Sequence, residues 1–176
     1  MSKPLKLFFD HTSSPKLPSL LRDFYAWEHP DMTAVHLRHK FDQNTDDQSW
    51  LSTLSAEGSW IVISEDRART SRVQPMPLIC QRLKITHVLV SDALRRFEDM
   101  KQALAECWRE IVALSEMPPG TRAVLRYRSH RSEERKAVLM IGDSKVSPQK
   151  KRRSPSKNPV PDNGVKAETH PDLFVS

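Results

Sequence analysis

Glycine is scarce in this sequence, with only four among 176 residues, at positions 58, 120, 142 and 164. These glycines are too far apart to form a phosphate-cradling loop of the P-loop or dinucleotide-binding type, because such a loop needs two or more glycines within a few residues. The sequence therefore disfavours a nucleotide-driven motor and a dehydrogenase.

Cysteine and long apolar runs are scarce as well. The only two cysteines, Cys80 and Cys107, lack C-x-x-C spacing, which disfavours a disulfide framework and a thiolate zinc site. The amino-terminal segment has three consecutive strongly apolar residues before Asp10, far fewer than a signal peptide or a membrane span requires. We therefore expect a cytoplasmic protein with no membrane partner.

Hydrophobic residues make up only 38% of the chain and charged residues 28%, so part of the chain is expected to lie outside the core. From residue 143 onward the sequence is rich in Pro, Ser and Lys and lacks apolar periodicity. We predict a folded domain over residues 1–142 and a disordered basic tail over residues 143–176. The basic run at 150–153 suits phosphate binding or a localisation signal, but such runs are more commonly solvated tails, which is the explanation we favour.

Short apolar runs alternate with helical patterns along the folded domain. Four runs that suit buried strands lie at residues 5–9, 33–37, 60–64 and 86–90. One long amphipathic helix is expected from about Ser91 to Ser115, followed by two weaker strands in "RAVLRY" and "KAVLMI". This alternation predicts an α/β fold with a mostly parallel central sheet flanked by helices on both faces.

Acidic residues follow the apolar runs. Asp10 follows the first run directly, Asp66 follows the third by one residue, and Asp46 and Asp47 open the helical pattern after the second. Ligand sites in parallel sheets form outside the carboxyl ends of the strands, so we expect these carboxylates at one edge. Each of them alone also suits a turn, or the first turn of a helix capped by Thr45.

Several carboxylates at one edge repel each other and raise each other's pKa unless a cation compensates their charge. Their hard oxygen atoms suit Mg²⁺ or Mn²⁺, which proteins hold with one or two carboxylates and retained waters. Such an ion lowers the pKa of an attacking water and stabilises charge on a scissile phosphate, so the pattern indicates phosphodiester chemistry. His36 and His39, at the end of a strand, are not expected to share a metal.

Three segments of the sequence carry a resemblance to a known family. They read "LKLFFDHTSSPKLPSLL", "VHLRHKFDQNTDDQSWL" and "WIVISEDRA". In order, they contain an Asp that ends a strand before a Ser-Pro-Leu helix, an Asp three residues before a Trp, and a strand that runs into a hydroxyl residue, any residue, Asp and Arg. This order resembles the PIN-like ribonuclease superfamily, and within it the VapC-type toxins of toxin-antitoxin pairs. The resemblance covers residues 5 to about 90 and implies a PIN-like three-layer fold.

The resemblance also implies the site residues. Asp10, Asp47 and Asp66 match the acidic positions that act in catalysis and bind the metal in the family. The supporting candidates beside them are Asp46, Ser64 and Glu65, of which Asp46 and Glu65 are the nearest to a fourth acid that the family commonly has. The basic residues that can hold the RNA backbone near this edge are Lys40, Arg67, Arg69 and Arg72.

On this resemblance we expect a Mg²⁺- or Mn²⁺-dependent endoribonuclease that hydrolyses RNA phosphodiester bonds and serves as the toxin of a toxin-antitoxin pair. Its partners would be the RNA substrate and a cognate antitoxin protein, and a homodimer is left open. One alternative is a catalytically inactive PIN-like module that binds nucleic acid or acts as a protein adaptor. The other is a DNA nuclease or phosphatase that uses the same carboxylates.

Overall fold

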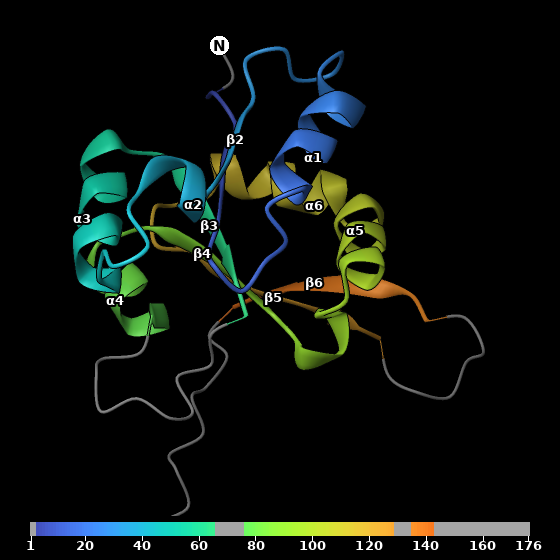
Figure 1. Ribbon diagram of the computed structural model, residues 1–176. Coiled ribbons are helices and arrows are strands. Elements are labelled where there is room, and N and C mark those ends of the chain that lie inside the picture. The colour runs from blue at the N-terminus through green and yellow to red at the C-terminus, as the bar shows by residue number, and fades with distance from the viewer. Residues whose placement is uncertain (1–2, 66–75, 129–134, 143–176) are drawn as a thin grey trace, which may run out of the picture. The chain divides into compact units, whose positions relative to one another are not determined.

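Six strands form one sheet within residues 3–65, 76–128 and 135–142, the part of the chain that the computed structural model describes (Figure 1). The strands are β1 (Lys6–Phe9), β2 (Thr33–His36), β3 (Trp60–Ser64), β4 (Thr86–Val90), β5 (Arg122–Tyr127) and β6 (Ala137–Ile141). Their order is β2-β1-β3-β4-β5-β6, with β6 antiparallel to β5 and every other pair parallel. The prediction of a mostly parallel sheet is confirmed.

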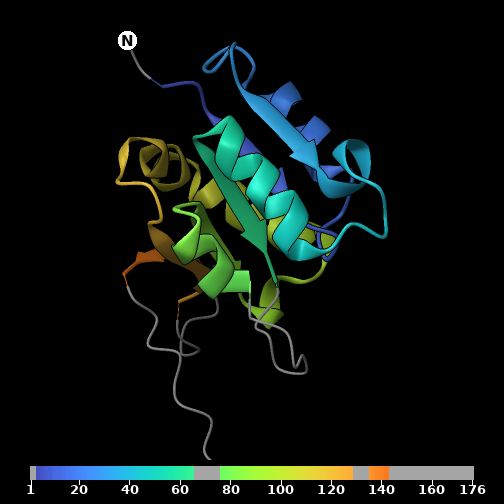
Figure 2. The same cartoon turned by 90° about the vertical axis from the view of Figure 1, so that its left-hand side faces the viewer.

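The helices cover both faces of this sheet. They are α1 (Leu17–Tyr25), α2 (Leu37–Lys40), α3 (Asp47–Glu57), α4 (Met76–Arg82), α5 (Phe97–Glu106) and α6 (Trp108–Ala113), with short 3-10 turns η1 (Asp92–Leu94) and η2 (Leu114–Glu116). Figure 2 shows α3 and α4 on the face nearer the viewer, whereas α1, α5 and α6 pack on the other face. In the described ranges, no helix is long and apolar enough to cross a membrane.

Side chains of the central strands alternate between two hydrophobic cores. Phe8 and Val62 belong to the core beneath α3 and α4, where Phe8 stacks on Trp50 with ring centroids 5.1 Å apart. Leu7 and Ile61 belong to the core beneath α1, α5 and α6. A strand buried on both faces has no solvent-facing positions, which explains why β1 and β3 are continuous apolar runs.

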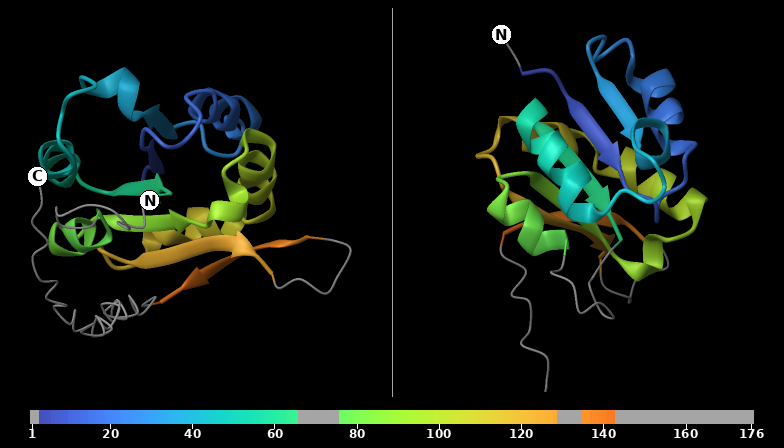
Figure 3. Two further views of the ribbon diagram at one scale, coloured as in Figure 1. Left: turned by 60° about the horizontal axis from the view of Figure 1, so that its bottom comes forward. Right: turned by 60° about the vertical axis from the view of Figure 1, so that its left-hand side comes forward.

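The parallel register brings the ends of three strands together. Phe9 pairs with Ile63, and Ile63 pairs with Val88, so β1, β3 and β4 end side by side. We call the edge of the sheet at which these three strands end, together with the segments that follow them, the carboxyl edge. Figure 3 shows the arrowheads of β1, β2 and β3 at the same end of the sheet.

The single helix expected from Ser91 to Ser115 is wrong. The chain instead forms η1, α5, α6 and η2, because the backbone of Arg96 is extended (φ −71°, ψ 142°) and that of Cys107 leaves the helical region (φ −104°, ψ 19°). The helical spacing of apolar residues continues across these breaks, since Leu94, Leu104 and Ile111 all lie in one core. Periodicity alone therefore did not indicate the breaks.

The predicted tail and its boundary after residue 142 stay predictions. The chain divides into two units, Met1–Lys145 and Val146–Ser176, and the whole second unit lies outside the described residues.

Candidate active site

Asp10 lies at the carboxyl edge and is fully buried. Its backbone N–H donates to the carbonyl of Ile63 at 3.2 Å, which continues the β1–β3 ladder by one residue. Its Oδ1 accepts hydrogen bonds from the backbone N of Thr12 at 3.1 Å and from Thr12 Oγ1 at 2.5 Å. This turn, in which an Asp side chain binds the backbone two residues ahead, fixes the position of the carboxylate.

Glu65 lies beside Asp10, directly after β3. Its side chain is 6% exposed, and its backbone N donates to Thr12 Oγ1 at 3.3 Å. Burial raises the pKa of Glu65, and the negative charge of Asp10 raises it further, while Arg95 opposes both effects. Among the described residues, its Oε1 atom has no hydrogen-bond partner although it is buried. Glu65 was a supporting candidate in the sequence, and the structure places it at the centre of the edge.

Asp92 and Arg95 join this group, and sequence reasoning missed both. Arg95 Nε lies 3.2 Å from Glu65 Oε2, and Arg95 Nη2 lies 3.2 Å from Asp92 Oδ1. Asp92 opens η1 just after β4, so it follows its strand much as Asp10 follows β1. That spacing was a usable signal, but the expected long helix from Ser91 placed both residues inside a helix.

Asp46 has a structural role at the start of α3. It is the N-cap, since its Oδ1 accepts from Ser49 N at 3.0 Å and its Oδ2 accepts from Ser49 Oγ at 2.6 Å. These hydrogen bonds lower the pKa of Asp46, the side-chain bond contributing most. The sequence analysis expected Thr45 to cap this helix, and the structure shows that Asp46 does so.

Asp47 occupies the first turn of α3 and is partly exposed. Its Oδ1 accepts a hydrogen bond from Trp50 Nε1 at 3.0 Å, which explains the spacing of three between them. Asp47 also lines a hollow of about 320 Å³ together with His11 and Arg38. Because His11 follows Asp10 in the chain, this hollow adjoins the end of β1, and the exposed Arg38 is a further basic residue at its wall.

Ser64 is buried in the protein interior. Its Oγ is 2.9 Å from Nε2 of His87, and both residues are buried. Burial, with a smaller effect of Arg122, lowers the pKa of His87 to about 3, so this histidine is neutral near pH 7. His36 is likewise structural, since Nε2 lies 3.0 Å from the Ser13 carbonyl and Nδ1 accepts from the backbone of α2.

The predicted basic residues are only partly described. Lys40 Nζ lies 2.7 Å from Glu57 Oε1 and 5.5 Å from the centroid of the Trp60 ring, so its ammonium lies beside the start of β3 and away from the carboxyl edge. The other three basic candidates lie outside the described residues, and they are Arg67, Arg69 and Arg72. The same holds for Asp66, the third predicted metal ligand.

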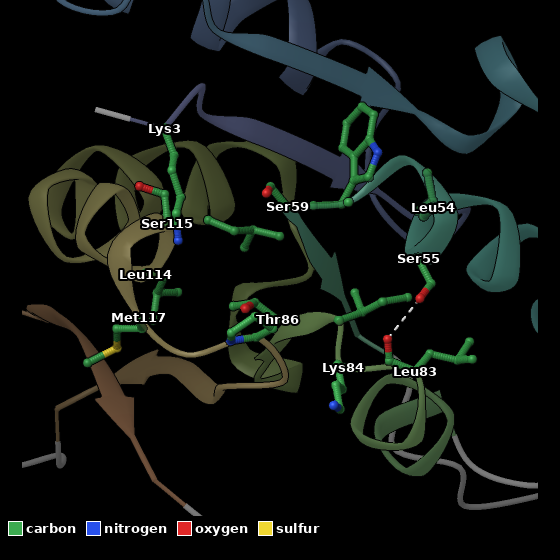
Figure 4. Close-up of a pocket in the computed structure, with 15 residues that line it drawn as sticks. Lys3, Leu54, Ser55, Ser59, Leu83, Lys84, Thr86, Leu114, Ser115 and Met117 are labelled. Atoms are coloured by element: carbon green, nitrogen blue, oxygen red, sulfur yellow. Dashed lines mark hydrogen bonds between the residues drawn. The ribbon is translucent and has the colours of Figure 1, made fainter. Parts of the chain in front are cut away.

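A second pocket lies at the opposite edge of the sheet, beside the starts of β3 and β4 (Figure 4). It has a volume of about 390 Å³ and is lined by apolar and hydroxyl side chains together with Lys3 and Lys84. Ser55 Oγ closes part of its wall with a hydrogen bond of 2.9 Å to the Leu83 carbonyl. Ligand sites of open α/β sheets lie at the carboxyl ends of the strands, so the chemistry is expected at the other edge.

The donor set at the carboxyl edge fits a hard divalent cation. In the described ranges, no group of three or more His, Cys, Asp or Glu side chains is arranged to hold a metal ion. Mg²⁺, however, needs only one or two carboxylates with retained waters. Asp10 and Glu65 supply buried carboxylates at neighbouring strand ends, and Glu65 Oε1 is an acceptor that a cation would satisfy.

Comparison with known proteins gives one match. Residues 5–83, just under half of the chain, match the sequence model of a family described as a PIN like domain. The matched residues include Asp10, Asp47 and Glu65 and end before Asp92. The match supports a PIN-like domain in this part of the chain, and such domains are commonly nucleases that use divalent metals. No curated protein and no solved structure matched the chain.

Proposed function

We propose that the PIN-like domain of this chain is a Mg²⁺- or Mn²⁺-dependent endoribonuclease that hydrolyses RNA phosphodiester bonds. The observation that carries the proposal is the pairing of Asp10 and Glu65, two buried carboxylates at adjacent strand ends whose charges act on each other. Burying like charges together is costly unless a cation compensates them, and Arg95 does so only in part, since the pKa of Glu65 stays raised.

The residues proposed to hold the ion are Asp10, Asp47, Glu65 and Asp66, with Asp92 beside them. When bound, the ion supplies a water of lowered pKa and charge stabilisation at the scissile phosphate. Thr12 keeps the Asp10 carboxylate in place through its two hydrogen bonds. Trp50 does the same for Asp47, so both carboxylates are oriented before substrate binds.

The proposed RNA contacts are electrostatic. Arg38 lines the same hollow as Asp47 and is exposed, so it replaces Lys40 as the first candidate for a phosphate contact near α2. Arg67, Arg69 and Arg72 stay candidates by their position after Asp66 in the sequence. RNA as the substrate comes from the resemblance, because a metal site alone does not distinguish RNA from DNA.

The proposed biological role is that of a toxin in a toxin-antitoxin pair. It rests on the resemblance of the three sequence segments to VapC-type toxins. The partner implied is an antitoxin protein that covers the acidic carboxyl edge with a basic or apolar segment. Co-expression with the product of the neighbouring reading frame would test this: relief of growth arrest supports the role, and persistent arrest contradicts it.

The decisive experiment compares single Asp-to-Asn variants in RNA cleavage with and without Mg²⁺. Asp10→Asn and Asp47→Asn are each expected to lower the rate at least about a hundredfold, since each removes a charge that holds the ion. Asp23→Asn, an exposed acid on α1, is the matched control and should cleave normally. Parallel assays on single-stranded DNA and a phosphomonoester identify the substrate class. Unchanged rates in both site variants would contradict the proposal.

A second candidate function is an inactive PIN-like module that binds nucleic acid or a protein partner. One observation favours it: in the part of the chain that the structure describes, no three metal-ligating side chains converge. An inactive module would bind RNA with the same affinity in the presence of Mg²⁺ or of a chelator, and it would not cleave it. The enzyme would cleave RNA only when the divalent ion is present.

A further inference from the structure

Arg95 bridges two acidic side chains at the carboxyl edge. Its Nε lies 3.2 Å from Glu65 Oε2, and its Nη2 lies 3.2 Å from Asp92 Oδ1. One guanidinium therefore contacts carboxylates that follow two neighbouring strands, β3 and β4. The Arg95 side chain is 62% exposed, so it can change partners without disturbing the core.

The carboxylate that Arg95 holds is unusual for an ion pair. The Glu65 side chain is 6% exposed, and its second oxygen, Oε1, is buried with no hydrogen-bond partner among the described residues. A single guanidinium nitrogen thus serves a carboxylate that still has unsatisfied acceptor capacity, which is energetically unfavourable. The site is therefore better suited to a compact divalent cation than to Arg95 alone.

The backbone break after η1 is what positions Arg95. Arg95 itself is helical (φ −65°, ψ −26°) and Arg96 is extended, so the chain turns between η1 and α5. This turn holds Arg95 within reach of Glu65 and of Asp92, three residues before it. Arg96, its neighbour, has the same charge and is also exposed, but no described ion pair joins it to these carboxylates.

We propose that Arg95 alternates between two partners. It pairs with Glu65 and Asp92 when the carboxyl edge lacks a divalent cation, and it binds a phosphate of the RNA when the cation occupies the edge. The inference rests on the proposed function, because it uses the same carboxylates and substrate. The forked N–H groups of a guanidinium fit carboxylates and phosphates alike, whereas the cation and the guanidinium compete for Glu65.

The first test measures Mn²⁺ binding by isothermal titration calorimetry in wild type, Arg95→Gln and Arg96→Gln. Arg95→Gln should bind Mn²⁺ about twofold to fivefold more tightly, because an exposed competitor is removed. Arg96→Gln removes the same charge nearby and controls for long-range electrostatics. The melting temperature of Arg95→Gln should also rise more on adding Mn²⁺ than that of wild type. Equal Mn²⁺ affinities in the two variants would overturn the competition.

The second test measures binding of a phosphorothioate oligoribonucleotide in the presence of Mn²⁺. Arg95→Gln should bind it about tenfold more weakly, and the slope of log affinity against log salt should fall in magnitude by about 0.7, as expected for one lost phosphate contact on a single strand. A residue that only stabilised the fold would not change the salt slope. Tighter Mn²⁺ binding with an unchanged RNA affinity and slope would overturn the exchange of partners.

The outcomes separate this inference from the proposed function. If wild type cleaves RNA with a divalent ion but both arginine variants behave alike, only the role of Arg95 fails. If no variant cleaves RNA yet Arg95→Gln alone gains Mn²⁺ affinity and loses RNA affinity, the exchange holds in a binding module. If no variant binds Mn²⁺, the exchange is overturned, since removing Arg95 then exposes no cation site.

Discussion

The backbone N–H of Glu65 donates a hydrogen bond to Thr12 Oγ1 at 3.3 Å, and this contact joins the turn after β1 to the end of β3. The same hydroxyl donates to Asp10 Oδ1 at 2.5 Å. One side chain therefore links the two buried acids of the carboxyl edge. Its position explains how the edge keeps its geometry although it consists of loops.

Removal of the Thr12 hydroxyl tests this link. Thr12→Val keeps the shape of the side chain but loses both contacts, so we expect a loss of about 1–2 kcal/mol in the free energy of unfolding and weaker Mn²⁺ binding. Thr12→Ser keeps the hydroxyl and should retain both properties. Urea unfolding and calorimetry would measure them, and equal behaviour of the Val and Ser variants would contradict the linking role.

Asp46 and Asp47 are adjacent in the chain and differ in role, which a pair of substitutions can separate. Asp46→Ala removes the N-cap of α3 and should lower the free energy of unfolding, with RNA cleavage retained. Asp46→Ser restores a capping oxygen and should recover most of that stability. Cleavage lost in Asp46→Ala, measured where the variant is fully folded, would assign Asp46 to the site instead.

The indole of Trp50 is expected to matter beyond packing. Trp50→Phe removes the hydrogen bond to Asp47 and should lower both stability, by about 1–2 kcal/mol, and RNA cleavage. Trp60 provides a matched control, because its Nε1 donates to Glu57 at 2.9 Å at the opposite edge. Trp60→Phe should lose comparable stability and keep its cleavage rate. Identical cleavage by the two variants would show that Asp47 does not need this contact.

His87 should make the protein sensitive to acid. Its pKa is lowered to about 3 by burial, whereas in the unfolded chain it is about 6.5. Between these values the unfolded chain binds a proton that the folded state excludes. The free energy of unfolding therefore rises with pH across this window, and acidification from pH 6.5 lowers it by about 1.4 kcal/mol per pH unit.

The measurement compares urea unfolding at pH 5 and pH 7. His87→Gln lacks this contribution. When the pH is lowered from 7 to 5, its free energy of unfolding should therefore decrease by about 2 kcal/mol less than that of wild type. His39→Gln, at an exposed histidine, controls for histidine loss as such. Parallel pH profiles of wild type and His87→Gln would mean that His87 is not buried in its neutral form.

Much of the fold was predictable from the sequence, because it depends on local patterns. The strands at β3, β4 and β5 were predicted at their observed bounds, because their apolar runs are short, rich in β-branched residues and bounded by turn residues. The break before Phe97 was not predictable in this way, because both sides of it keep the helical period of one core.

The site was predictable only in part, for a related reason. Asp10 could be placed at the carboxyl edge because it directly follows a strand and parallel strands end together. Neither spacing nor composition shows which of two adjacent acids caps α3, because that choice depends on where the helix begins.

By itself, then, the sequence determined the alternation of strands and helices and the presence of acids after the strands, since both are properties of short segments. Only the tertiary structure decided that Glu65 is buried beside Asp10 and that Arg95 reaches it from the turn after β4. These contacts join residues 55 and 30 positions apart in the sequence, and they form because the sheet order places β3 between β1 and β4.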